Sequence, residues 1–293
     1  MRYFSEIAEA GSFTAAAARL HIAQPALSRQ IAALERDLGV ALFIRQPSGV
    51  ALTAAGEILQ RHAEAIRLQA ARARQEIADA GGDASGWISF GTNPSLGKLL
   101  FGAVAEAITD RYPRMRVSFM EGVGAQLLNR VHDGTLDLAI TSRPAHAPGI
   151  EFRNLFSEPV FVIAAEDKPA LPRLSSWEDM GGLPLVVTNQ QTSIASWVEE
   201  QSGLARTDLD LRFRVESAQA ALDIVRRGLA YGVVPQSALD EPGARGGLQA
   251  KPLESVKLER YLAWSRERDA DNAFVAFGEI VTSVARTVFT PDA

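Results

Sequence analysis

The 293-residue sequence predicts an α/β fold preceded by a helical N-terminal module, and three observations carry this prediction. The first eighty residues have the apolar periodicity of helices almost throughout, apart from one short turn-rich stretch near residue 47. A small and polar segment, GGDASG at 81–86, then interrupts that pattern. After it, short apolar runs alternate with amphipathic stretches, which is typical of a largely parallel sheet with helices between its strands.

The composition limits the classes of protein that the chain can be. With 47% hydrophobic and 22% charged residues it can bury ordinary cores, and its length indicates two or three domains. No run of 18 apolar residues, no export signal and no cysteine is present, which predicts a cytoplasmic protein without disulfides or cysteine-ligated zinc. The net charge is −5, although residues 1–53 hold five arginines and only four acids. Nucleic-acid binding would therefore need aimed arginines rather than a broad basic surface.

The N-terminal module divides at capping residues and glycines. Gly11 ends a first amphipathic segment, and Ser12 can cap the helix that follows. Pro25 suits the first turn of the third helix, because proline has no N–H to lose there, and Gly39 ends that helix. Thr53 can cap a long fourth helix. The expected helices cover residues 2–9, 13–20, about 25–38 and 54–80, and two expected strands cover 43–45 and 50–52 around the turn Pro47-Ser48-Gly49.

The fourth helix carries an apolar seam. Its apolar residues recur with alternating spacings of four and three, so they lie on one helix face. Charged residues occupy the other faces, which favours an interface with the same helix of a second copy. A face that packs within the chain is the alternative. The seam, rich in alanine, consists of Leu59, Ala63, Ile66, Ala70, Ala73, Ile77 and Ala80.

The first three helices and the strands after them indicate a winged helix-turn-helix with a recognition helix. Arginine can bond a guanine edge and glutamine an adenine edge, and an arginine on the wing can pair with phosphate. One such helix reads only a few base pairs, so selectivity requires two copies, which the seam would supply. A helical packing module with solvated polar residues is the alternative. The candidate DNA-binding residues are Ser12, Thr14, Gln24, Pro25, Ser28, Arg29, Gln30 and Arg45.

The alternating part after residue 86 contains two sets of strands and therefore indicates two lobes. The expected strands cover 87–91, 115–120, 136–141, 160–165, 184–188, 211–215, 231–234 and 258–264. The expected helices cover 96–111, 123–133, 193–202, 217–227 and 271–289.

The loops after these strands are candidates for a ligand site. Ligands of open α/β sheets bind beyond the C-terminal strand ends, at helix N-termini. Small hydroxyls and backbone amides gather there and suit a carboxylate or another small anion, with Arg143 nearby. Each residue taken alone could instead be a plain helix cap. The candidates are Thr92, Asn93, Pro94, Ser95, Gly122, Val123, Thr141, Ser142, Thr192, Ser193 and Ser217.

The stretch GSFTAAAARLHIAQPALSRQIAALERDLGVALFIRQPSGVALTAAGE closely resembles the N-terminal domain of LysR-type transcriptional regulators. GWISFGTNPSLGKLL, LLNRVHDGTLDLAIT and YGVVPQSAL resemble the effector-binding part of that family, so the resemblance covers essentially the whole chain. HIAQPALS, and the spacing from Arg45 to Gly49-Val50, are similar to the nitrogen-assimilation regulators of the family.

The resemblance implies a DNA-binding domain at 1–53, a linker and dimerisation helix at 54–80, a hinge at 81–86 and an effector-binding domain at 87–293. The last would be two-lobed like periplasmic binding proteins, with lobe I at 87–159 plus 266–293 and lobe II at 160–265. Members often act as homodimers or homotetramers on double-stranded promoter DNA, with RNA polymerase as a partner and a small-molecule effector that alters transcription.

Three departures from the family pattern predict weaker and more salt-sensitive DNA binding. The chain begins several residues later than members usually do, so either its start is misassigned or the first helix lacks its leading turn and is less stable. Ala23 stands where members usually carry Ser or Thr, and losing that cap costs about 1 kcal/mol. Ser48 and Ala51 on the wing replace residues that are commonly basic.

The sequence contains none of the enzyme motifs considered in complete form. GTNPSLGKL is no phosphate loop, because five residues separate its glycines and Leu99 replaces the magnesium-binding hydroxyl. The sequence has no G-x-S-x-G elbow and no H-E-x-x-H, and its four histidines lack metal spacing. We therefore expect no enzyme activity, no cofactor and no metal. The alternative function is a small-molecule-binding α/β protein or enzyme fused to a helical interaction module.

Overall fold

The computed structural model describes residues 1–46, 49–78, 86–142, 147–169, 171, 177–188, 209–268 and 272–289. For Arg45, Leu68, Gln69, residues 71–78, Trp177, Glu178 and Ser255 the description covers the backbone alone. The chain divides into two compact units, residues 1–78 and 79–293.

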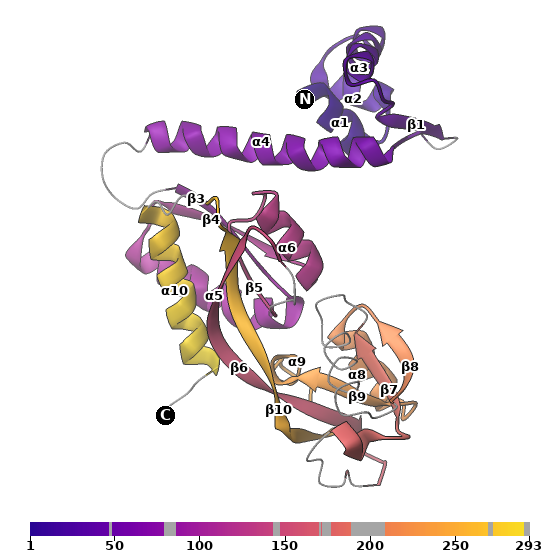
Figure 1. Cartoon of the computed structure of the whole chain (residues 1–293), viewed down its shortest axis with the longest axis vertical. Coiled ribbons are helices and arrows are strands. Elements are labelled where there is room, and N and C mark those ends of the chain that lie inside the picture. The colour runs from indigo at the N-terminus through magenta and orange to yellow at the C-terminus, as the bar shows by residue number, and fades with distance from the viewer. Residues whose placement is uncertain are drawn as a thin grey trace. The chain divides into compact units, whose positions relative to one another are not determined.

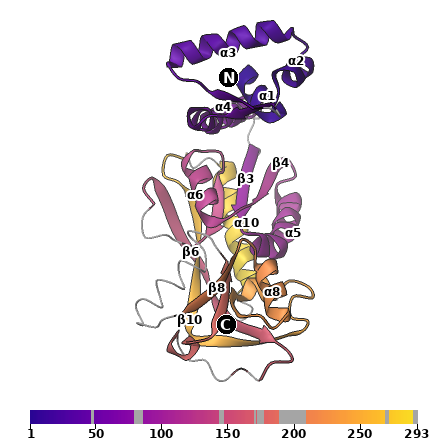
Figure 2. The same cartoon turned by 90° about the vertical axis from the view of Figure 1, so that its right-hand side faces the viewer.

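The first unit is a helical module with a hairpin. Figures 1 and 2 show α1 lying between α3 and α4, and the core residues Phe4, Ile7, Leu27 and Ile31 are buried between these helices. The expected helices and strands are confirmed. They are α1 (Arg2–Ala10), α2 (Phe13–Leu20), α3 (Gln24–Leu38), β1 (Phe43–Gln46), β2 (Gly49–Leu52) and α4 (Ala54–Ala78). The strands β1 and β2 pair antiparallel as the expected wing, and Ser48 at its turn lies outside the described residues.

Capping residues begin the helices where the sequence predicts. The Ser12 hydroxyl accepts a hydrogen bond from the Ala15 amide at 3.4 Å, and the Thr53 hydroxyl accepts one from the Gly56 amide at 3.0 Å. Ala23, at the start of α3, offers no side-chain cap. The missing side-chain cap is what the sequence predicts at this position.

The hairpin is fixed to the helices by backbone and side-chain contacts. A Glu35 carboxylate oxygen on α3 accepts from the amides of Leu42, at 2.7 Å, and Phe43, at 3.3 Å. Gly49 opens β2 against the Gly11 carbonyl, which would lie only 2.4 Å from a Cβ at position 49. Only glycine fits this approach, and its φ of 139° is one that other residues rarely adopt.

The predicted seam on α4 divides into two parts. Leu59 packs against the core of the first unit and Ala63 is buried, so these two positions are used at least in part within the chain. Ile66 is 55% exposed and Ala70 is exposed as well. The side chains of Ala73 and Ile77, and the whole of Ala80, lie outside the description.

The second unit alternates strands and helices. Its strands are β3 (Gly86–Thr92), β4 (Met115–Glu121), β5 (Leu138–Thr141), β6 (Ile150–Ala165), β7 (Pro184–Thr188), β8 (Asp210–Val215), β9 (Tyr231–Pro235) and β10 (Leu248–Ser265). Its helices are α5 (Pro94–Arg111), α6 (Gly124–His132), α8 (Ala218–Arg226), α9 (Gln236–Leu239) and α10 (Asn272–Phe289), with a 3₁₀ turn at Trp177–Met180. The helix expected at 193–202 and most of the hinge expected at 81–86 lie outside the described residues.

The eight strands form one mixed sheet in the order β4-β3-β5-β10-β6-β9-β7-β8. The three strands at each end are parallel to one another, as the sequence predicts. The two central strands, β6 and β10, are antiparallel and run side by side from one lobe to the other (Figure 1).

These central strands are longer than the sequence predicts. Pro159 lies inside β6, and a register shift between Pro252 and Lys257 interrupts β10, so both apolar runs look shorter than the strands are. The shared strands also affect the expected lobe limits at 159/160 and 265/266. Tyr261 to Ala263 pair with β5 of lobe I, although those limits assign them to lobe II.

Each lobe has its own apolar core. In lobe I, α5 and α10 cover Phe90, whose ring meets that of Phe277 at a centroid distance of 5.6 Å. In lobe II, Val162 and Leu185 belong to one buried cluster and Val186 and Leu222 to another. Among the described residues, no helix is long and apolar enough to cross a membrane, and no group of three or more His, Asp or Glu side chains could hold a metal ion.

Candidate functional site

A pocket of about 130 Å³ lies in the second unit, where both lobes contribute helix N-termini. The first residues of α5, α6 and α8 reach it, and β10 supplies part of its wall. The partial positive charge of a helix N-terminus favours a negatively charged group. The lining among the described residues is Asn93, Pro94, Ser95, Lys98, Gly124, Leu127, Ile140, Thr141, Ser142, Thr188, Glu216, Ser217, Ala218, Gln219, Pro235, Glu241, Leu258 and Arg260.

Many of the predicted ligand residues line this pocket. Two of them are helix caps as well: the Asn93 side chain accepts from the Leu96 amide at 2.9 Å, and the Ser217 hydroxyl accepts from the Ala220 amide at 3.2 Å. The two interpretations of these residues, cap and pocket wall, are therefore compatible. The predicted residues in the lining are Asn93, Pro94, Ser95, Thr141, Ser142 and Ser217.

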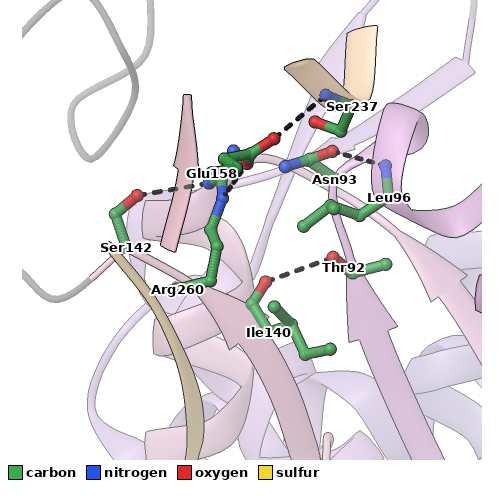
Figure 3. A network of polar contacts seen from close by, with 8 residues as sticks. All are labelled: Thr92, Asn93, Leu96, Ile140, Ser142, Glu158, Ser237 and Arg260. Carbon is green, nitrogen blue, oxygen red and sulfur yellow. Dashed lines mark hydrogen bonds and ion pairs between the residues drawn. The ribbon is translucent and has the colours of Figure 1, made fainter. Parts of the chain in front are cut away.

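Other predicted residues serve the fold beside the pocket. Thr92 is buried, and its hydroxyl donates to the Ile140 carbonyl at 3.2 Å, as Figure 3 shows. Gly122 and Val123 do not line the pocket. The Gly122 amide donates to the Thr92 carbonyl at 3.1 Å, and Val123 directly precedes α6. The candidates Arg143, Thr192 and Ser193 lie outside the described residues.

Arg260, which lines the pocket, belongs to a buried ion pair. The Arg260 Nε donates to a Glu158 oxygen at 2.5 Å, and the two side chains are only 7% and 1% exposed. Figure 3 shows that this pair continues in both directions. Arg260 also donates to the Ser142 hydroxyl of lobe I at 3.2 Å, and the Ser237 amide of lobe II donates to Glu158 at 3.0 Å. The pair therefore ties both lobes to the central strands.

A second ion pair lies nearer the solvent. Lys98, in the second turn of α5, pairs with Glu241, which follows α9. Both residues line the pocket, and they come from different lobes. Glu216 adds another carboxylate to the lining, directly before Ser217.

Sequence reasoning missed all of these charged residues. Arg260 and Glu158 are 102 positions apart, and no local pattern connects them. The sequence could have predicted Lys98, because it follows Ser95 by three residues and such neighbours share a helix face. The rule about strand ends finds hydroxyls and caps, but it does not find side chains that point in from strands.

In the first unit, the start of α3 presents polar side chains to solvent. Gln24, Pro25, Arg29 and Gln30 are exposed, and Ser28 is half-buried. The Gln24 amide donates to the Ser28 hydroxyl at 2.9 Å. The Arg29 side chain has no hydrogen bond or ion pair to any other residue that the structure describes. The apolar face of the same helix, with Leu27 and Ile31, is buried.

The remaining DNA-binding candidates lie near this helix or on the wing. Thr14 on α2 is exposed and Ser12 is half-buried, whereas the Arg45 side chain lies outside the description.

On α4, the Glu64 carboxylate accepts two hydrogen bonds from Arg67, at 2.9 and 2.6 Å, and this contact raises the pKa of the Arg67 guanidinium above its ordinary value.

Two family models together match nearly all of the chain. Residues 1–57 match the bacterial regulatory helix-turn-helix protein, lysR family, and residues 81–286 match the LysR substrate binding domain. The nitrogen assimilation regulatory protein nac of Escherichia coli is 30% identical over 81% of this chain and 78% of its own length. The regulator BbuR of Bordetella bronchiseptica is 28% identical over 98% of this chain and 90% of its own length.

Solved structures agree with these matches. CbnR, described as a LysR family transcriptional regulator, has a TM-score of 0.73 and 26% identity, with 97% of both chains covered. CbnR complexed with its target DNA gives a TM-score of 0.72 at 26% identity and covers 97% of this chain and 98% of its own.

A helix-turn-helix joined to a two-lobed domain with a pocket between its lobes defines a ligand-responsive transcriptional regulator. Each of the two parts matches a LysR family model of its own. The chain belongs to the LysR family of transcriptional regulators, with a DNA-binding helix-turn-helix and an effector-binding domain. It is accordingly a regulator and not an enzyme, and the family predicted from the sequence is confirmed.

The buried ion pair generates a prediction about stability. Replacing Arg260 with Met leaves Glu158 buried without its cation, so the second unit should lose about 3–5 kcal/mol of unfolding free energy. Urea unfolding followed by tryptophan fluorescence measures this unit alone, because all four tryptophans lie after residue 86.

Arg266→Met is the matched control, since its ion pair with Glu151 has side chains 69% and 42% exposed. That variant should lose less than about 1 kcal/mol. Equal losses of unfolding free energy in the two variants would show that the buried pair stabilises the unit no more than the exposed pair does.

Proposed function

We propose that the chain binds promoter DNA in the cytoplasm as a homodimer or homotetramer and changes transcription when a small carboxylate or related anion enters its pocket. One observation carries the effector class. The lining combines the N-termini of three helices and hydroxyl groups with the cations Lys98 and Arg260, beside the carboxylates Glu216 and Glu241. Such a set of groups favours a negatively charged ligand.

The DNA part of the proposal rests on the exposed turn of α3. A buried apolar face and an exposed polar start are what a recognition helix needs to lie in a major groove. Arg29 is exposed and unpaired among the described residues, so its guanidinium can form two hydrogen bonds with a guanine. CbnR, whose structure with its target DNA is known, supports the same use of this module.

The oligomer follows from the need for two half-sites. A single recognition helix contacts too few base pairs to select a promoter, so two copies must be held about 34 Å apart. Ile66 is a large apolar side chain that the first unit leaves exposed, and it lies on the seam predicted for the partner helix. RNA polymerase is the partner that a promoter-bound regulator of this kind would contact.

Replacing Arg29 with Ala should weaken binding to the specific site by about 1–3 kcal/mol and relax the choice of base at one position. Fluorescence anisotropy with a DNA fragment from upstream of the gene measures both effects. Arg36→Ala is the control, because Arg36 lies in the last turn of the same helix and bonds to the Ala32 carbonyl. A loss of folding in Arg29→Ala would show instead that this residue is structural.

Replacing Ile66 with Asp should weaken the dimer, because two carboxylates would face each other across the seam. Sedimentation at several protein concentrations measures the change, and binding to paired half-sites should fall with it. Gln60→Asp adds the same charge on another face of α4 and should leave the dimer intact. Dimers of full strength in Ile66→Asp would mean that the seam lies elsewhere.

The effector class is tested by calorimetric titration with small carboxylates, amino acids and sugars. We expect carboxylates to bind and their primary amides to bind at least tenfold more weakly, since the amides lack the charge that the pocket favours. Binding by sugars or neutral amides alone would overturn this effector class.

A further inference from the structure

We propose that the Glu241 carboxylate is a built-in competitor for the Lys98 ammonium group, and that an anionic effector binds by taking its place. This inference rests on the effector class proposed above. It assigns a role to one ion pair of the pocket and so deepens the regulation of that site.

The ion pair lies where an incoming ligand can reach it. Lys98 is on α5 of lobe I, one turn after Pro94 and Ser95 at the pocket rim, and its side chain is 53% exposed. Glu241 follows α9 of lobe II, and its side chain is only 10% exposed. A carboxylate of the chain itself is therefore paired with the Lys98 ammonium group, and both residues line the pocket.

The two cations of the lining differ in how easily they can change partners. Arg260 is buried with Glu158, and separating them would leave an uncompensated charge in the interior. The Lys98 side chain is 53% exposed, although Glu241 is 10% exposed, so the ammonium group remains within reach of a ligand that enters from solvent. Lys98 is therefore the cation on which a ligand carboxylate can replace a protein carboxylate.

Release of Glu241 has a clear physical outcome. The residue is followed by the exposed turn Pro242-Gly243, where a displaced carboxylate can meet water. A ligand without negative charge cannot compete for Lys98 and leaves the pair intact. Because Lys98 and Glu241 belong to different lobes, the exchange removes an inter-lobe contact only when an anion binds. The pair thus makes the change between the lobes selective for anions.

Acetate, which has the same head group as glutamate, is the probe for the vacated position. In the full-length Glu241→Ala variant, roughly 0.2 M sodium acetate should raise the melting temperature of the second unit by about 1–3 °C relative to sodium chloride of equal ionic strength. The wild type should respond less than Glu241→Ala, because acetate must first displace the Glu241 carboxylate from Lys98. The double variant Lys98→Met/Glu241→Ala should not respond, since the cation is gone.

The neighbouring Asp240 provides the matched control. Asp240 is exposed, pairs with Arg245 and does not line the pocket. Asp240→Ala removes the same charge one residue away and should behave like the wild type. If Glu241→Ala fails to respond to acetate, or if the double variant responds equally, the proposal is overturned.

A second measurement uses the conservative variant Glu241→Gln, which keeps the shape of the side chain. Titration with acetate, succinate and benzoate should give about 2- to 5-fold tighter binding than in the wild type for those that bind. The corresponding amides should show no gain. Unchanged or weaker binding of all three carboxylates would overturn the proposal.

The two proposals fail in distinguishable ways. If Glu241→Ala responds to acetate through Lys98 but the wild-type protein binds only neutral ligands, the competitor position stands and the effector class fails. If carboxylates bind the wild type but neither variant changes their affinity or the acetate response, the effector class stands and the competitor fails.

Discussion

The buried pair of Glu158 and Arg260 is the constraint on which the effector-binding unit depends. The two residues lie on the central strands that pass through both lobes, and they are bonded to Ser142 of lobe I and Ser237 of lobe II. An ion pair without water cannot be loosened on one side without exposing the other charge to an apolar interior. This wall of the pocket is therefore rigid, and any change between the lobes must occur around it.

Because this wall is rigid, a ligand must bind through the other groups of the pocket. The helix N-termini and the hydroxyls offer donors to a ligand, but Arg260 is already engaged with a carboxylate of the chain. In the proposed exchange a ligand takes over a cation that solvent can reach, and Lys98 is such a cation. The same chemistry, a cation facing a carboxylate, thus holds the fold at Arg260 and is proposed to respond to a ligand at Lys98, and the two cations differ in their exposure.

The sequence predicts most of the elements and part of the site, and the division has a physical cause. Ser12 and Thr53 are caps, and their effect is local, so the pattern finds them. Asn93 and Ser142 follow strands, and the ends of parallel strands meet at one edge. Arg260 reaches the pocket from inside a long strand whose partner is 102 residues away, and a proline and a bulge hide the length of the strands themselves. Contacts that depend on the folded sheet leave no local signal.

The recognition helix shows the complementary case, in which function lies in what the fold leaves unsatisfied. Leu27 and Ile31 are enough to fix α3 in its module, and Glu35 ties it to the wing. The start of the helix has no side-chain cap at Ala23, and Arg29 has no described partner. Donors of this kind gain most from an acceptor outside the chain, and the edges and phosphates of a duplex supply such acceptors. Because Ala23 contributes no hydroxyl, the proposed DNA binding depends more on Arg29 and its polar neighbours, so we expect the affinity for DNA to rest on a few side chains on one turn of helix.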